Sequence, residues 1–260
     1  MEPLRRALKA FWSVPAKEIM NQLGHTRSAY RLDHLLQTPD TFVRAPLPGM
    51  DKVTAIVHVA PPAGAAFTQY TAEFAAAGVL QSGPLQRFIY VLEGELETSG
   101  GALGSGSFLY CPPGHKHSLR AASPARAVVI EKPYQPLDGS AAPTHFRGRE
   151  SEVVPQPLLG DPALEVRALV PADAGFDFAV NTMSYQPGAA LPMVEIHYME
   201  HGLLMLEGGG IYRLGEHWYP VTAGDFIWMA PYCPQWFGAL GKTPAKYLIY
   251  KDWNRYPVSR

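Results

Sequence analysis

The chain has 260 residues, and its 22 basic and 23 acidic side chains give a formal net charge of −1. This length suits one large domain or two small ones, and near-neutral charge without a basic block argues against nucleic acid or an anionic membrane as partner. Two cysteines do not make a disulfide framework, and no apolar run reaches the ~18–20 residues of a membrane span. We therefore expect a soluble, cytoplasmic protein.

The first forty residues carry the only helix-like patterns, around Leu4–Phe11 and Lys17–Leu23, with a short stretch at Tyr30–Leu36. After them come short runs rich in β-branched and aromatic residues, bounded by glycine, proline or asparagine. The predicted strands are Val53–Val59, Phe88–Leu96, Ser107–Cys111, Ala127–Glu131, Phe178–Tyr185, Gly202–Leu206, Asp225–Met229 and Ala245–Tyr250. These patterns predict a mostly-β protein.

An internal repeat divides the chain. Phe88–Gly94 matches Gly202–Gly208 in pattern, and Gly106–Pro113 matches Gly224–Pro231, in the same order and at similar spacing. Two copies of one all-β unit in tandem explain this agreement. The stretch from Pro133 has linker composition, which places the boundary near residues 135–150. We expect an N-terminal extension at 1–45, a first barrel at 46–140 and a second at 150–260.

The second copy contains a spaced set of metal-binding residue types, namely Glu195, His197, His201 and Gln235. Residues two apart on a strand share a face, so Glu195 and His197 should project together, with His201 at the start of the next strand. Each residue alone has an ordinary structural explanation, and the joint pattern between flanking glycines carries the hypothesis. Two imidazoles, a carboxylate and an amide oxygen suit Mn²⁺, Fe²⁺ or Ni²⁺.

These motifs resemble those of the cupins, jelly-roll β-barrels with two metal-binding motifs. The donors of the first motif are exchanged here, because Glu195 takes the first histidine place and His201 the glutamate place. In the second motif Gln235 takes the histidine place, and Ala230 and Tyr232 replace proline and glycine. This exchanged set in the C-terminal half of a bicupin resembles the (S)-ureidoglycine aminohydrolase family of purine (allantoin) degradation.

The resemblance covers most of the chain, including Tyr110–Pro113, Ala174–Asp177, Glu200–Gly202 and Tyr247–Asp252. It implies an all-β bicupin of two tandem barrels, a homo-oligomer, and one Mn²⁺ per chain. The residues it implies as ligands are Glu195, His197, His201 and Gln235. The residues it implies as substrate contacts are Glu195, Gln235, Tyr247 and Lys251, with Tyr212 where the family also has a tyrosine.

The spacing of the last strand independently supports two of these contacts. Tyr247, Ile249 and Lys251 share one face by the period of two. A lysine inside a barrel is costly unless it is paired, and a substrate carboxylate would supply the partner. The alternative is that Lys251 is the solvated end of the strand.

The first copy departs from the cupin pattern. Its second motif is intact from Gly106 to His117, but the places of the first motif carry Gln81, Gly83 and Arg87. Glycine offers no donor and arginine keeps its proton, so one imidazole remains. We expect a metal-free first barrel that serves packing, dimerisation or covering of the second barrel's mouth.

The expected function is metal-dependent hydrolysis of the small molecule (S)-ureidoglycine to (S)-ureidoglycolate and ammonia. Glu195 is the candidate for moving a proton between water and the departing amine, and Lys251 and Tyr247 complete the catalytic set. Two alternatives stay open. One is another metal-dependent cupin enzyme, such as a dioxygenase or an isomerase of a small carboxylate. The other is a non-catalytic, small-molecule-binding bicupin.

Overall fold

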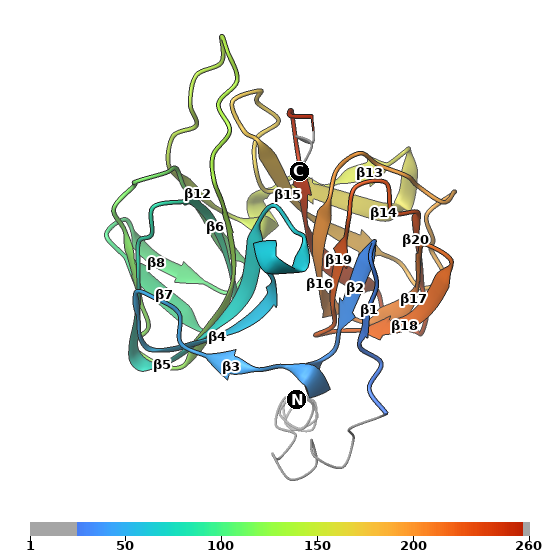
Figure 1. The fold of residues 1–260 in the computed structure, drawn as a ribbon, viewed down its shortest axis with the longest axis horizontal. Helices are drawn as coiled ribbons and strands as arrows, with labels where there is room; N and C mark the ends of the chain where they lie inside the picture. Colours follow the sequence, from blue (N-terminus) through green and yellow to red (C-terminus); the bar gives the residue numbers. More distant parts are fainter. Residues whose placement is uncertain (1–24, 257–260) are drawn as a thin grey trace.

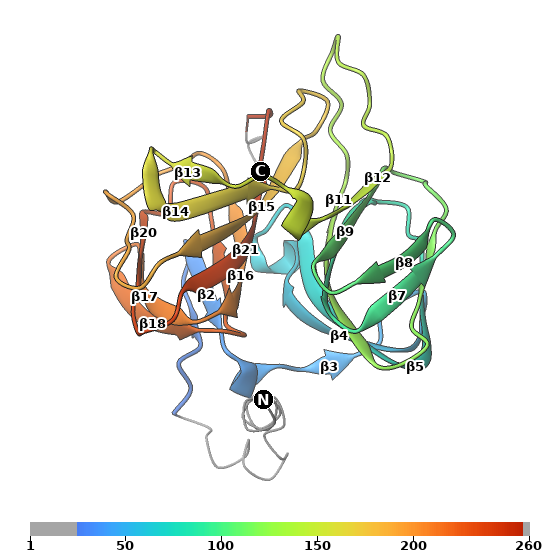
Figure 2. The same ribbon diagram turned by 180° about the vertical axis from the view of Figure 1, so that it is seen from behind.

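The computed structural model describes residues 25–256, which form two β-barrels side by side (Figure 1; Figure 2 shows the reverse face). The predicted all-β, two-barrel architecture is confirmed. The helices expected at 4–11 and 17–23 lie outside the described residues. Within the described part, no helix is long and apolar enough to cross a membrane.

The first barrel is a single ten-stranded sheet. Its strands are β3 (Arg44–Ala45), β4 (Met50–Val59), β5 (Thr68–Gln81), β6 (Gln86–Glu93), β7 (Glu95–Thr98), β8 (Gly101–Gly104), β9 (Ser107–Cys111), β10 (Ser118–Arg120), β11 (Ala125–Lys132) and β12 (Phe146–Arg149). The long strand β5 escaped prediction because its middle, with three successive alanines and Gly78, has low β propensity. It nevertheless pairs with both β4 and β11, so tertiary pairing overrides the local preference.

The second barrel combines an eight-stranded and a three-stranded sheet. Its strands are β13 (Gln156–Leu158), β14 (Asp161–Ala168), β15 (Phe178–Tyr185), β16 (His201–Glu207), β17 (Gly209–Leu214), β18 (His217–Thr222), β19 (Phe226–Met229), β20 (Gln235–Ala239) and β21 (Ala245–Asp252). Strands β17, β18 and β20 make the smaller sheet. The larger sheet is completed from the N-terminal part of the chain.

The two barrels exchange their leading strands. β1 (Ala29–Tyr30) and β2 (His34–Gln37) precede the first barrel, yet β2 pairs with β19 of the second (Figure 1). Conversely, β12 precedes the second barrel and pairs with β9 of the first. The helix expected at Tyr30–Leu36 is therefore wrong. His34 and Leu36 are buried and alternate with half-buried neighbours, which is the period of a strand completing the edge of β19.

Three apolar clusters follow from the period of two. One fills each barrel, and the third lies between the barrels, where Phe88 and Tyr110 pack near Phe178. On β21, Tyr247 belongs to the interior of the second barrel and Tyr250 to the cluster between the barrels. The alternation therefore directs odd-numbered side chains of β21 into the second barrel.

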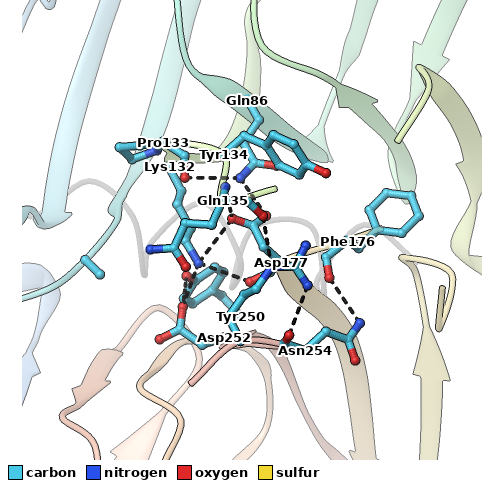
Figure 3. A network of polar contacts seen from close by, with 12 residues as sticks. Gln86, Lys132, Pro133, Tyr134, Gln135, Phe176, Asp177, Tyr250, Asp252 and Asn254 are labelled. Carbon is cyan, nitrogen blue, oxygen red and sulfur yellow. Dashed lines mark hydrogen bonds and ion pairs between the residues drawn. The ribbon is translucent and has the colours of Figure 1, made fainter. Parts of the chain in front are cut away.

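A polar network closes the contact between the barrels (Figure 3). The buried Asp177 carboxylate accepts hydrogen bonds from the Gln86 side chain at 2.7 Å and from the backbone of Gln135 at 2.9 Å. The Lys132 ammonium lies 3.5 Å from Asp177 and 3.0 Å from Asp252. Because each buried charge has an opposite charge and hydrogen-bond donors or acceptors beside it, the network fixes the relative placement of the barrels.

Candidate active site

A cavity of about 190 Å³ opens inside the second barrel, and all seven residues predicted for the site line it. They are Glu195, His197, His201, Tyr212, Gln235, Tyr247 and Lys251. Its other walls are Leu158, Val166, Asn181, Met183, Leu191 and Ile249. Residues that are far apart in the sequence thus share one small, mixed polar and apolar space.

Glu195 and His197 do not lie on a regular strand, which corrects the expectation from sequence. Glu195 forms an isolated bridge with Gln235, with backbone N–H···O distances of 2.8 and 2.9 Å in the two directions. The two side chains still meet, because Glu195 Oε2 lies 3.2 Å from His197 Nε2. The bridge to β20, rather than a continuous strand, therefore fixes the carboxylate.

The turn between β19 and β20 holds the backbone of His197. The Tyr232 amide donates to the His197 carbonyl oxygen at 2.6 Å. Tyr232 has φ of 64°, in the left-handed region that the glycine of the second motif would occupy, and Gly114 has φ of 73° at the matching turn of the first barrel. A non-glycine residue held in this conformation is strained, typically by about 1–3 kcal/mol. The turn keeps the cupin geometry despite the replaced glycine.

His201 begins β16, as predicted, and pairs across the sheet with Lys251 of β21. Burial, aided by the charges of His197 and Lys251, lowers the pKa of His201 to about 3, so its imidazole is neutral near pH 7. Lys251 is half-buried, and burial also lowers its pKa, against the opposing charge of Glu195. Among the described residues Lys251 makes no ion pair, and its ammonium lies 4.5 Å from the Trp253 ring centroid.

The two tyrosines are held by neighbours that sequence reasoning only partly found. Tyr212 donates to Gln235 Oε1 at 3.2 Å, and the Tyr247 hydroxyl lies 2.7 Å from that of Tyr185. Tyr185 was not predicted, nor were Asn181 and Met183 in the cavity wall. The signal was available, because all three alternate on the predicted strand Phe178–Tyr185 and so share one face.

The first barrel uses the same places differently. Arg87 is buried and donates to Glu131 Oε1 at 2.7 Å, to the Gln81 carbonyl oxygen at 2.9 Å and to His117 Nε2 at 3.0 Å. Gln81, Arg87 and His117, which the repeat aligned with cupin motif positions, therefore come together. The guanidinium bonds to the imidazole nitrogen that a cation would need.

The donor set of the second barrel is chemically suited to a divalent metal. It offers one carboxylate, two imidazoles and one amide oxygen with no thiolate, a borderline-hard combination. The donor atoms of Glu195, His197 and His201 do not all lie within 4.8 Å of one another. They line one cavity without forming a closed cluster.

Comparison with known proteins identifies the family. Residues 181–250, which carry this donor set, match the cupin domain family. The (S)-ureidoglycine aminohydrolase of Arabidopsis thaliana is 43% identical over 245 residues, covering 90% of this chain and 80% of that protein. This chain belongs to the (S)-ureidoglycine aminohydrolase family. As a member, it is an enzyme, a hydrolase acting on a carbon–nitrogen bond.

Two further relatives match this chain along most of its length. The (S)-ureidoglycine aminohydrolase of Escherichia coli strain K12 is 32% identical over 231 residues, covering 85% of this chain and 88% of that one. A solved structure of a protein from Pseudomonas aeruginosa, described as glyoxylate-induced, superposes with a TM-score of 0.82 at 31% identity. It covers 90% of this chain and 93% of that one, so the likeness includes both barrels.

Proposed function

We propose that this aminohydrolase converts (S)-ureidoglycine and water to (S)-ureidoglycolate and ammonia in the cavity of the second barrel. The observation that carries the proposal is the convergence of Glu195, Gln235, Tyr247 and Lys251 on one cavity of about 190 Å³. Family membership supports the same reaction, because the relatives from A. thaliana and E. coli carry that activity in their names.

The residues that would hold Mn²⁺ are Glu195, His197, His201 and Gln235. A divalent cation there supplies Lewis acidity for the charge that develops as the carbon–nitrogen bond breaks. The neutral imidazole of His201 is the form that binds a metal, and the contact of Tyr212 with Gln235 orients the amide oxygen.

Lys251 would hold the substrate carboxylate. Its ammonium group is half-buried at the cavity wall and makes no ion pair among the described residues. Leaving a desolvated cation unpaired is costly, and a bound carboxylate removes that cost. A fixed carboxylate together with a fixed amine and ureido group defines one hand at the reacting carbon, which gives selectivity for the (S) enantiomer.

Glu195 would move the proton that the reaction requires. A C–O bond to water forms and the C–N bond to the α-amine breaks, so one proton passes from water to the departing amine. The Glu195 carboxylate lies at the cavity wall beside His197 and is fixed through its backbone bridge to Gln235. Its position suits this transfer, whose usual contribution is about 10²–10⁴-fold in rate.

The test is ammonia release by metal-stripped and Mn²⁺-reconstituted protein, with ureidoglycine generated in place from allantoate by allantoate amidohydrolase. We expect manganese-dependent release above the spontaneous rate, with (S)-ureidoglycolate as product. No acceleration by the reconstituted protein would overturn the proposal, and oxygen consumption instead would indicate a cupin dioxygenase. The homo-oligomer and the cytoplasmic location stay predictions.

A further inference from the structure

We propose that Cys111, His115 and His145 form a zinc-binding site at the rim of the first barrel. It is separate from the second-barrel cavity and does not depend on the proposed reaction. Sequence reasoning placed no metal in the first barrel because it considered only the motif positions. None of the three residues here occupies one of those positions, because Cys111 and His115 lie between the motif residues and His145 lies beyond them.

The donors come together from three segments of the chain. Cys111 ends β9, His115 lies in the following loop, and His145 immediately precedes β12. The thiol sulfur and one ring nitrogen of each histidine all lie within 4.8 Å of one another. The two imidazole rings are stacked, with centroids 4.5 Å apart and an interplanar angle of 16°. The nitrogen lone pairs of stacked rings lie in nearly parallel planes, so one ring must turn before both imidazoles can bind one ion. His145 is the exposed member of the pair and has room to turn.

None of the three donors is committed to another group. Cys111 is buried and free, and its thiol makes no hydrogen bond within residues 25–256. The His115 and His145 rings likewise make no hydrogen bond to the described residues. His117, by contrast, is occupied, because its Nε2 faces Arg87 and its Nδ1 lies 3.0 Å from the His115 carbonyl oxygen. The available ligand set is therefore one thiol and two imidazoles.

The second barrel provides an internal comparison. Asp33, His34 and Cys233 also lie within 4.8 Å of one another, at the corresponding rim beside β2. There, both ring nitrogens of His34 are engaged at 2.8 Å, with Asp33 and Tyr219, and the Cys233 thiol approaches Asp33 at 3.8 Å. That group is a completed hydrogen-bond network. The ligand atoms of the first-barrel group lie equally close together, but they make no hydrogen bonds to one another.

Thiolate and neutral imidazole are donor types that Zn²⁺ takes, and as a four-coordinate ion it would keep water in the fourth place. On binding, the Cys111 S–H bond is replaced by a bond to zinc and the proton leaves to solvent. The ion would tie the segment leading into β12 to the loop after β9. Since β12 is the strand that crosses from the linker to the first barrel, the site would reinforce that exchange.

The test uses Co²⁺ as a spectroscopic probe on the full chain, with His197→Ala and His201→Ala introduced to weaken the second-barrel site. We expect one equivalent of Co²⁺ bound with a near-ultraviolet thiolate-to-metal charge-transfer band, displaced by Zn²⁺. Cys111→Ala should abolish the band, whereas Cys233→Ala, the matched change at the other buried cysteine, should leave it intact.

His145→Ala provides a second measurement, because this exposed side chain can be removed without disturbing the core. This variant should weaken Co²⁺ binding by at least about 100-fold. Loss of a residue that only supports a ligand already costs up to about 100-fold, and His145 would be a ligand itself. The variant should also abolish any rise in Tm caused by Zn²⁺. A missing charge-transfer band, a band that survives Cys111→Ala, or equal affinity in His145→Ala would each overturn the proposal.

Discussion

Arg87 in the first barrel occupies the place that His201 occupies in the second. Each faces the last long strand of its barrel, with Arg87 opposite Glu131 of β11 and His201 opposite Lys251 of β21. In the first barrel these two positions carry a buried arginine–carboxylate pair. In the second they carry a neutral histidine and a lysine facing a cavity. The same position of the repeat therefore carries a buried ion pair in the first barrel and lines a cavity in the second.

Arg87→Met should destabilise the protein by about 3 kcal/mol, because it leaves the largely buried Glu131 carboxylate without its cation. Turnover per folded molecule should not change, since Arg87 lies in the other barrel from the cavity. Urea unfolding and ammonia release well below Tm measure the two effects. Arg44→Met, which breaks an exposed pair with Glu73, should cost less than about 1 kcal/mol. Equal costs for both variants would show that the Arg87 pair contributes no more than a surface pair.

Lys251→Met should raise KM by roughly 10- to 150-fold, the equivalent of about 1.5–3 kcal/mol for a hydrogen bond to a charged group. Its stability should stay the same or rise, because the variant removes a half-buried charge that has no ion-pair partner among the described residues. Steady-state kinetics and thermal unfolding measure both.

Lys246→Met is the matched control on the same strand. Lys246 pairs with Glu150 at 2.7 Å and lines a different cavity, between the barrels. This variant should lose stability and keep its KM. If Lys251→Met kept its KM as well, the carboxylate would have to bind elsewhere.

Glu195→Ala should lower kcat by about 10²–10⁴-fold if the carboxylate transfers the proton. The fold should survive, because the bridge to Gln235 uses backbone atoms only. Near-ultraviolet circular dichroism checks the fold and ammonia release the rate. Glu165→Ala removes a partly exposed carboxylate from β14, next to the cavity-lining Val166, and should leave kcat unchanged. A Glu195→Ala protein that retains most of its rate with metal bound would exclude Glu195 from the transfer.

Glu150 should make stability depend on pH in the acid range. Burial alone would raise its pKa, but hydrogen bonds from Lys246, Tyr90 and Thr182 outweigh burial and lower the pKa. Because the folded pKa lies below the unfolded one, the carboxylate stabilises the fold above its unfolded pKa. This contribution is lost as the pH falls through the folded pKa.

Glu150→Gln should therefore cost about 2 kcal/mol near pH 7, and the difference from wild type should shrink below about pH 4. Urea unfolding of both proteins at several pH values measures the difference. A gap that stays constant down to acid pH would assign the loss to shape or packing rather than to the charge.

Local pattern determined much of this protein. The period of two and the turn residues were enough for an all-β fold, since they mark which side chains are buried and where strands stop. Strands β9 and β15 begin and end where the pattern placed them. The sequence also named residues that the structure brings to one cavity of the second barrel, because residue chemistry and spacing are local properties. The internal repeat likewise aligned Arg87 with a ligand position, because the order and spacing of its motifs belong to the sequence.

Tertiary structure decided which segments meet. The stretch Tyr30–Leu36 has a local pattern compatible with a short helix. Its second half instead forms a strand, because it pairs with the open edge of β19. Glu195 is placed by its bridge to Gln235, forty residues away in the chain, and not by a strand of its own. Cys111 and His145 meet because β12 crosses to β9. Periodicity records which face is buried, whereas the choice of partner strand depends on long-range hydrogen bonding and shared apolar contact, which no local pattern contains.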